Sequence, residues 1–211
     1  MQLVQTIRVL LLGLAVTALA SCGALSALGD ATEALDVYEL RAPTDAPIAP
    51  GRRIAADVII EVPTTSGALQ TDRIMIRPDA LAASYLPGIR WSEEAPVMVQ
   101  TLMLRTLDAT QAIRYVGRRP LGAGGDFAVV TELVDFQATP LPEGDSARVD
   151  VRMIVRIVRE RNVRIVASRS FATSAMAPTL EDADLVAAFD TAAGRVMSDF
   201  ADWALVSLRR S

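Results

Sequence analysis

The chain has 211 residues, of which 51% are hydrophobic, and it carries 21 basic and 25 acidic side chains with no histidine. All 21 basic residues are arginines. The lack of histidine excludes a Ser-His-Asp hydrolase, a histidine-ligated zinc site and an imidazole general base. The lack of lysine excludes Schiff-base chemistry and a P-loop lysine. A net acidic chain is also a poor candidate for general nucleic-acid binding.

The N-terminal segment is typical of a secretory signal. An apolar run over residues 9–20 follows a single charge at Arg8 and contains no acidic residue. This run is shorter than the roughly 20 apolar residues that a membrane-spanning helix needs. Small residues precede Cys22, which is the only cysteine in the chain. We therefore predict a signal peptide over residues 1–21.

The segment Leu19-Ala20-Ser21-Cys22 resembles a bacterial lipobox. In that motif the cysteine thiol receives a diacylglycerol, the chain is cut before the cysteine, and the new amine is acylated, commonly with palmitate. An ordinary signal peptide with a cysteine at its cleavage site is the alternative. No second cysteine exists to form a disulfide, and a free thiol is a liability in an oxidising compartment. We predict lipid attachment at Cys22, an anchor and tether over residues 22–36, and one domain over residues 37–211.

Alternation of apolar and polar residues predicts about six strands in that domain. The clearest covers residues 147–158, where valine, methionine and isoleucine alternate with arginine and aspartate. Residues 159–162 are typical of a turn, so the next alternating segment, 163–173, is expected to pair back as an antiparallel hairpin. The other predicted strands cover residues 37–40, 54–62, 73–77 and 127–138.

Two segments have helical spacing. Ser92 is a candidate N-cap for a helix that ends near Leu107, with Glu93 and Glu94 in its first turn. A longer helix is expected from the start signal at residues 178–182 to about residue 209. The order of elements predicts an α+β fold, with a mostly antiparallel sheet of about six strands and two helices packed on one face.

A family resemblance rests on the order and spacing of short motifs over nearly the whole chain after the tether. The motifs are Tyr38-x-Leu40, the strand at residues 72–77, Ile89-Arg90-Trp91 before a helix, Val134-Asp135-Phe136, Arg169-Ser170-Phe171 and Trp203 in the final helix. Together with the lipobox, they resemble the ABC-type transport auxiliary lipoproteins, the PqiC-like family. The resemblance implies a non-enzymatic, periplasm-facing lipoprotein that needs no cofactor or metal.

The same resemblance implies the partners. These are an MCE-domain substrate-binding protein and the ABC permease and ATPase of one system, which moves phospholipid or other apolar molecules between the inner and outer membranes. The acyl anchor implies membrane attachment, and a homo-oligomer is left open. Gly23 is not the aspartate that retains many lipoproteins at the inner membrane, so we expect the periplasmic face of the outer membrane in a Gram-negative envelope.

Four residues are candidate partner contacts: Arg90, Trp91, Arg152 and Arg156. Exposed tryptophan and arginine are common hot spots in interfaces, and arginines on one sheet face suit an acidic lipid or partner. The alternatives are that Trp91 packs in the core and that the arginines form a solvated face. Phe189, Phe200 and Trp203 could likewise shape a lipid groove or pack as helical core.

Two other functions are considered. An outer-membrane assembly or maintenance lipoprotein would have the same anchor without the transporter partner. A carboxylate-dependent hydrolase of envelope polymers would need two facing acids in a cleft, and no acidic pair in the sequence has a telling spacing.

Overall fold

The computed structural model describes residues 35–43, 52–119 and 124–211. The chain divides into two units, Met1–Asp36 and Val37–Ser211, of which the second contains nearly all the described residues. Nine strands and two helices are assigned among the described residues, and apart from Asp36 at the start of the first strand they belong to the second unit. The predicted signal peptide and the lipobox lie outside the described residues, so their processing stays a prediction.

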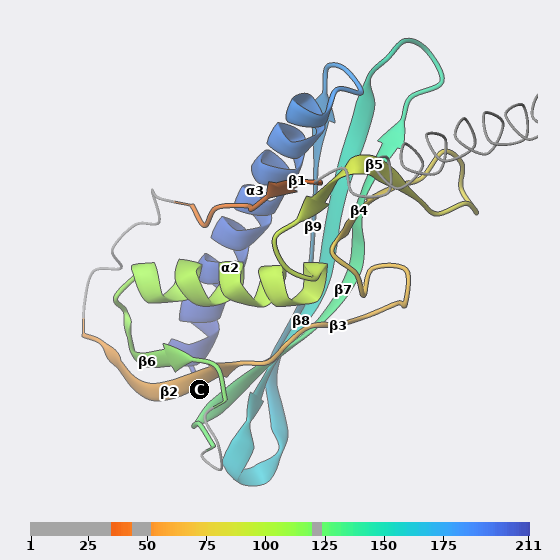
Figure 1. Cartoon of the computed structure of the whole chain (residues 1–211). Helices are drawn as coiled ribbons and strands as arrows, with labels where there is room; N and C mark the ends of the chain where they lie inside the picture. Colours follow the sequence, from red (N-terminus) through yellow and green to blue (C-terminus); the bar gives the residue numbers. More distant parts are fainter. Residues whose placement is uncertain (1–34, 44–51, 120–123) are drawn as a thin grey trace, which may run out of the picture. The chain divides into compact units, whose positions relative to one another are not determined.

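The elements follow one another as an α+β chain (Figure 1). Six strands and the shorter helix come first: β1 (Asp36–Tyr38), β2 (Ile54–Ile60), β3 (Thr64–Thr65), β4 (Arg73–Ile76), β5 (Ser84–Trp91), α2 (Ala95–Ala109) and β6 (Ile113–Gly117). Three long strands and the longer helix follow: β7 (Phe127–Pro140), β8 (Ala147–Arg159), the 3-10 turn η1 (Glu160–Asn162), β9 (Arg164–Ala177) and α3 (Asp182–Arg209).

Strand β7 organises the sheet because both of its edges are occupied. Along one edge, β8 pairs with it antiparallel over its full length, and β9 pairs antiparallel with β8. Along the other edge, β2, β3 and β4 follow one another and all run parallel to β7. β6 adds to β2 in parallel, whereas β5 pairs antiparallel with β4 and carries β1 at its far side.

The sheet is therefore mixed and has nine strands, which corrects the prediction of a mostly antiparallel sheet of about six strands. The physical reason is the route of the chain. Between Val58 and Ile76 the chain advances along β7 in the direction in which β7 itself runs, in three short steps. Each step forms a short strand that is parallel to β7. Alternation of apolar and polar residues within one segment does not show whether the neighbouring strand is parallel or antiparallel, so the sequence could not predict this arrangement.

The strands that were not predicted are short or irregular. β3 has only two residues, too few to show alternation. β5 contains Pro87 and Gly88, and Gly88 has a φ of +74°, so its apolar residues do not alternate regularly. β6 is a five-residue strand in which Arg114 and Tyr115 are both exposed in succession. Proline and glycine inside a strand weaken the usual sequence signal.

Both helices cover the same face of the sheet. Thr131 and Val155 are cross-strand partners in β7 and β8 and so share one face. Thr131 contacts the Met103 sulfur of α2 at 3.6 Å, while Phe171 of β9, on that same face, stacks edge-on against Phe200 of α3 at 6.3 Å between ring centroids. Every second residue of β8 from Ala147 to Ile157 is accordingly buried, whereas Arg148 and Arg152 on the opposite face are exposed.

Three aromatic rings at the centre of the core connect separate parts of the chain. Trp91 ends β5, Phe136 lies in β7 and Phe189 lies in α3, and each has at most 1% of its surface exposed. Their ring centroids are 5.1 to 5.8 Å apart. Tilted and edge-on pairs at such distances are favourable beyond the burial of their surface. We call these three residues the aromatic cluster.

The two helices start differently from one another. α3 has Glu181 as its N-cap, with Asp182 and Asp184 in its first turn, which agrees with the predicted start. α2 does not start at Ser92: its N-cap is Glu94, and no acidic residue lies in its first turn. Proline suits the first helical positions, and α2 begins there with a proline. The backbone N–H of Ser92 instead donates to the Tyr38 carbonyl oxygen at 2.8 Å, which holds it in the extended link before the helix.

The turn between β8 and β9 ends at Val163, which adopts a left-handed backbone conformation with φ 52°. This conformation places Cβ close to the following carbonyl oxygen, and a branched side chain makes the contact worse. Val163 is also 82% exposed, so no core contact compensates for the strain. The turn is thus built around a residue that its backbone does not favour.

Replacing Phe189 with alanine should lower the free energy of unfolding by about 3–5 kcal/mol, because the substitution leaves a cavity among rigid rings. Phe189→Leu should lower it by only about 1 kcal/mol, since much of the volume is kept. Urea unfolding followed by circular dichroism measures both. Equal losses in the two variants would contradict the tight packing of the aromatic cluster.

Replacing Val163 with asparagine should raise the free energy of unfolding by roughly 0.5–1 kcal/mol, because asparagine tolerates the left-handed region. Ile165→Asn is the matched control, since Ile165 is also exposed but lies within β9 and has no positive φ. The control should be neutral or destabilising. A stability gain in both variants would show that removal of exposed apolar surface, rather than relief of backbone strain, is responsible.

Candidate interaction surface

The residues proposed as partner contacts lie in different environments. Trp91 is completely buried in the aromatic cluster and has no surface to offer a partner, so its prediction as a contact is wrong and the core alternative is correct. Its ring packs against Phe136 of β7 and Phe189 of α3, at the point where β5 leads toward α2. Arg90 remains partly exposed and forms an ion pair with Asp72 at 3.2 Å.

Arg152 and Arg156 lie on the open face of the sheet, opposite the helices. Arg152 donates to an Asp135 carboxylate oxygen at 2.5 Å across the β7–β8 pair, and Arg148 donates to both oxygens of Asp150 at 3.0 Å. No ion pair of Arg156 occurs within the described ranges. We call the face of the sheet that carries Arg148, Arg152 and Arg156 the open sheet face.

A shallow hollow of about 430 Å³ lies on the open sheet face, between Asp135, Arg152 and Ser174. The side chains beside it on β9 are small, including Ala172 and Ser174, so the backbone of this edge strand is accessible. Polar and small side chains around a shallow hollow suit a polar partner surface rather than a buried acyl chain.

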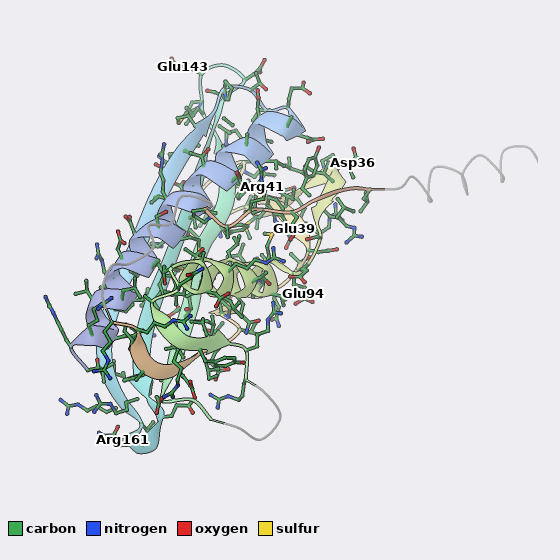
Figure 2. The ribbon with its side chains drawn as sticks, turned by 90° about the vertical axis from the view of Figure 1, so that its left-hand side faces the viewer. Asp36, Glu39, Arg41, Glu94, Glu143 and Arg161 are labelled. Atoms are coloured by element: carbon green, nitrogen blue, oxygen red, sulfur yellow. The ribbon has the colours of Figure 1, made fainter. Side chains whose placement is uncertain are left out.

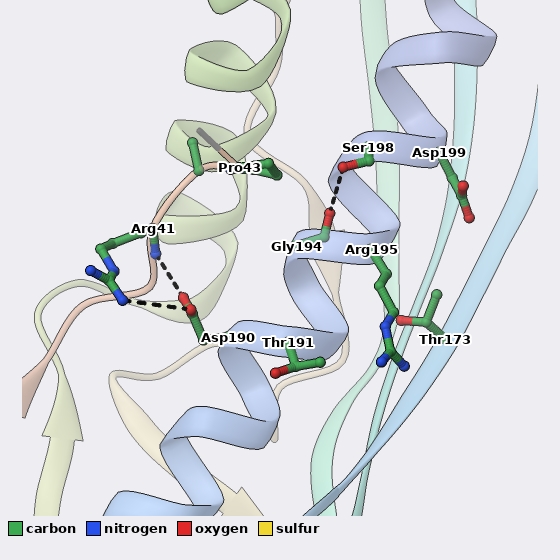
Figure 3. A pocket seen from close by; sticks show the side chains of 10 residues that line it. Arg41, Pro43, Thr173, Asp190, Thr191, Gly194, Arg195, Ser198 and Asp199 are labelled. Atoms are coloured by element: carbon green, nitrogen blue, oxygen red, sulfur yellow. Dashed lines mark hydrogen bonds and ion pairs between the residues drawn. The ribbon is translucent and has the colours of Figure 1, made fainter. Parts of the chain in front are cut away.

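A second groove of about 690 Å³ runs between α3 and the chain after β1 (Figure 3). The Arg41 backbone N–H donates to an Asp190 carboxylate oxygen at 3.1 Å, and the Arg41 guanidinium lies 4.0 Å from the same carboxylate. On the other side, Arg195 donates to the Ser174 carbonyl oxygen at 3.2 Å. Helix α3 therefore lines one wall of the groove with the acidic Asp190 and the basic Arg195. The hydrogen bond from Arg195 also connects α3 to β9.

The aromatic residues considered for a lipid groove are part of the core. Phe189 and Phe200 are completely buried, and Trp203 packs edge-on against Phe171 at 5.5 Å between centroids. The core alternative is therefore correct for these residues. Within the described ranges, no group of three or more acidic or cysteine side chains is placed to hold a metal ion. Neither described helix is long and apolar enough to cross a membrane.

An ion-pair network fixes the start of the β8–β9 turn. The Arg119 guanidinium bridges Glu61 and Glu160, and the other carboxylate oxygen of Glu160 accepts the Gly125 backbone N–H at 2.9 Å. Arg119 in particular lowers the pKa of Glu160 below its ordinary value, and the Gly125 hydrogen bond acts in the same direction. A side chain at Gly125 would lie 2.8 Å from the Asp57 carbonyl oxygen, which explains the glycine.

Comparison with known proteins identifies the family. A family model described as the ABC-type transport auxiliary lipoprotein component matches residues 38–201. The chain belongs to this family. The match runs from β1 into the last third of α3, so it covers the sheet and both helices. The resemblance noted from short motifs is confirmed, and this family is an auxiliary transport component rather than an enzyme family.

Relatives of this auxiliary lipoprotein share its fold at low sequence identity. Protein bll6063 of Bradyrhizobium diazoefficiens is 27% identical over 172 residues, which cover 81% of this chain and 45% of the relative. The chain therefore spans about half the length of that curated relative. The crystal structure of protein XCC0632 from Xanthomonas campestris, a DUF330 protein, matches with a TM-score of 0.74 at 18% identity, over 84% of this chain and 97% of that chain.

A second crystal structure, of an uncharacterized protein, matches with a TM-score of 0.62 at 11% identity, over 82% of this chain and 99% of that chain. At these identities the two structures establish the fold alone. The family itself is described as a lipoprotein component that is auxiliary to ABC-type transport.

Sequence reasoning missed several residues that shape these surfaces. Arg41 and Asp190 are 149 positions apart, and Arg119 and Glu160 are 41 apart, so no local pattern could pair them. The cross-strand pair of Arg152 and Asp135 depends on a register shift between Leu133 and Asp135 in the β7–β8 ladder. Alternation predicted the face on which Arg152 lies but not its partner.

Because Glu160 has a lowered pKa, its interactions stabilise the fold fully above its ordinary pKa of 4.5 and are lost as pH falls below that value. We expect Glu160→Gln to be less stable than the unsubstituted protein by roughly 1 kcal/mol at pH 7, with a smaller difference at pH 3. Urea midpoints at the two pH values measure this. Glu143→Gln, in the β7–β8 turn, is the control, and a Glu160→Gln deficit that does not depend on pH would contradict the ion-pair explanation.

Proposed function

We propose that this auxiliary lipoprotein is a non-enzymatic, periplasm-facing component of an MCE-associated ABC system that moves phospholipid or other apolar compounds between the inner and outer membranes. The observation that carries the proposal is the family match, which spans the folded domain rather than a short motif. The predicted lipobox at residues 19–22 supports an envelope location through an acyl anchor.

The packing supports an adaptor role rather than a carrier role. The rings considered for a lipid groove are packed in the core: Phe189 contacts Phe136 of β7, and Phe200 and Trp203 contact Phe171 of β9. The two grooves described above are open and bordered by arginine, aspartate, serine and threonine. Such surfaces suit contact with another protein, while the transported molecule is held elsewhere in the system.

The open sheet face is our candidate surface for the MCE-domain protein, the permease or the ATPase-bound complex. It presents Arg152 and Arg156 beside the small side chains of the edge strand β9. An arginine already held by Asp135 loses little conformational freedom when a partner covers it. Apart from the Ser174 carbonyl oxygen, which accepts from Arg195, the outer edge of β9 also offers backbone groups to a partner strand.

Anchoring follows from the same proposal. Acylation of Cys22 would hold the chain on a membrane, with residues 22–36 as the tether, and Gly23 favours the periplasmic face of the outer membrane. The competing function is an outer-membrane assembly or maintenance lipoprotein that works without a transporter. The open, polar surfaces fit either function, and the family match favours the transporter.

Purification of the tagged full-length protein from crosslinked membranes, followed by mass spectrometry, tests the proposal. We expect recovery of an MCE-domain protein with its permease and ATPase, and weaker recovery for Cys22→Ala because the chain is no longer concentrated at the membrane. Recovery of outer-membrane assembly factors instead would favour the competing function.

A pair of charge reversals tests the surface. Arg152→Glu should reduce recovery of the partner at least tenfold, since it places two carboxylates together on the open sheet face. Arg105→Glu is the matched control: Arg105 is 56% exposed against 49% for Arg152, and it also forms a cross-element ion pair, with Glu39. Equal losses in the two variants would contradict the assignment of the open sheet face.

A further inference from the structure

Acidic and basic side chains gather at opposite ends of the domain. β8 and α3 both run from an acidic end to a basic end (Figure 2, where Glu143 and Arg161 mark the two ends). Glu143 and Asp145 lie in the turn before β8, and acidic residues open α3. The register places these segments together, because Ala147 at the start of β8 pairs with Ala177 at the end of β9.

The opposite end carries four exposed arginines: Arg161, Arg164, Arg209 and Arg210. Arg161 lies in the β8–β9 turn, Arg164 is the first residue of β9, and the last two lie at the C-terminal end of α3. Arg159 joins these segments, because its guanidinium donates to the backbone oxygen of Ser211 at 2.8 Å. We call the four arginines the basic end. No ion pair of these four occurs among the described residues.

Exposed aliphatic side chains lie among these arginines. Val163 is 82% exposed and Ile165 is 54% exposed, on either side of Arg164. Val206 is 48% exposed and shares a face of α3 with Arg209 and Arg210, which follow it by three and four residues. Apolar side chains interleaved with arginines are the composition of a surface that enters the boundary between lipid headgroups and acyl chains.

Val163 adds an independent observation, because a strained backbone holds it at the tip of the turn. The ladder between β7 and β8 starts at the pair Phe127–Arg159, so the turn projects past the end of β7. A valine in the left-handed region is both strained and exposed, although asparagine or glycine would fit better. Strain of this kind is typical of functional positions. At Val163 the strained backbone places an exposed apolar side chain at the tip of the turn.

A hollow at the base of the turn has matching chemistry. About 350 Å³ in volume, it is lined by Arg159 and Arg161, by the apolar side chains of Ile54, Phe127 and Leu208, and by Asp126, whose carboxylate is already paired with Arg114 at 3.0 Å. A guanidinium binds a phosphodiester through paired hydrogen bonds. The apolar border suits the glycerol and the first methylenes of a lipid.

We propose that the basic end docks on the surface of an anionic lipid bilayer, with Val163 and Ile165 at the depth of the headgroup boundary and the surrounding arginines on the lipid phosphates. Charge complementarity identifies the occupant, since the chain as a whole is acidic while this end is basic. The apolar tip favours a bilayer over an acidic protein, because a flat acidic surface offers nothing to an isolated aliphatic side chain. This contact does not depend on the proposed transporter partner.

The test uses residues 22–211 with Cys22→Ser, so that no acyl chain contributes. The buried hydrophobic residues among those that the structure describes lie between Leu40 and Leu208 and are kept. Vesicle flotation compares vesicles of phosphatidylcholine alone with vesicles that contain equal parts of phosphatidylcholine and phosphatidylglycerol. We expect binding to the mixed vesicles only, and a decrease as salt is raised. Arg161→Gln with Arg164→Gln should weaken partitioning by roughly tenfold or more.

Two further variants make the result specific. Arg41→Gln with Arg105→Gln changes the net charge by the same amount at exposed positions away from the basic end, and should bind like the unsubstituted protein. Val163→Asn should bind more weakly while its urea midpoint rises, a combination that loss of folding cannot produce. Failure to bind the mixed vesicles, or equal loss in both arginine pairs, would overturn the proposal.

Discussion

The packing of Trp91, Phe136 and Phe189 is the constraint on which the rest of the structure depends. These rings come from β5, β7 and α3, and their centroids lie 5.1 to 5.8 Å apart. Because β5 leads directly into α2, the same contact also fixes where that helix begins. One cluster therefore holds both helices against one sheet face, and the opposite face remains open for polar residues.

The second constraint is that β7 has different neighbours on its two edges. A continuous partner, β8, lies along one edge, and three short strands share the other. The continuous side extends outward through β9 and produces both the open sheet face and the projecting turn. The surfaces that we connect with partner and lipid contacts therefore belong to the long hairpin, while the short strands serve the core.

Regular elements could be predicted from the sequence where local signals and tertiary packing agree. The hairpin of β8 and β9 and the start of α3 follow from alternation and from acidic residues at a helix start. The prediction of Ser92 as the N-cap of α2 was wrong because a backbone hydrogen bond to Tyr38, 54 residues away, holds Ser92 outside the helix. Trp91 illustrates the same limit: residue type alone allows a core ring or an interface anchor, and only the position of Phe136 and Phe189 decides. The pairings of Arg119 and Arg152 depend on register between distant strands, which no single segment encodes.

The charge division along the domain has a partial explanation in helix electrostatics. Acidic residues at the start of α3 and arginines at its end both complement the helix dipole, so the longest helix alone would give the domain ends of opposite sign. That explanation does not extend to Arg161 in the β8–β9 turn or to Arg164 at the start of β9, because the only helical structure there is a single 3-10 turn. It also leaves Val163 unexplained, since a strained and exposed valine stabilises neither the helix nor the core. The residues at this end that folding does not require are thus the arginines and the aliphatic tip of the turn, and their joint chemistry is that of a surface facing anionic lipid.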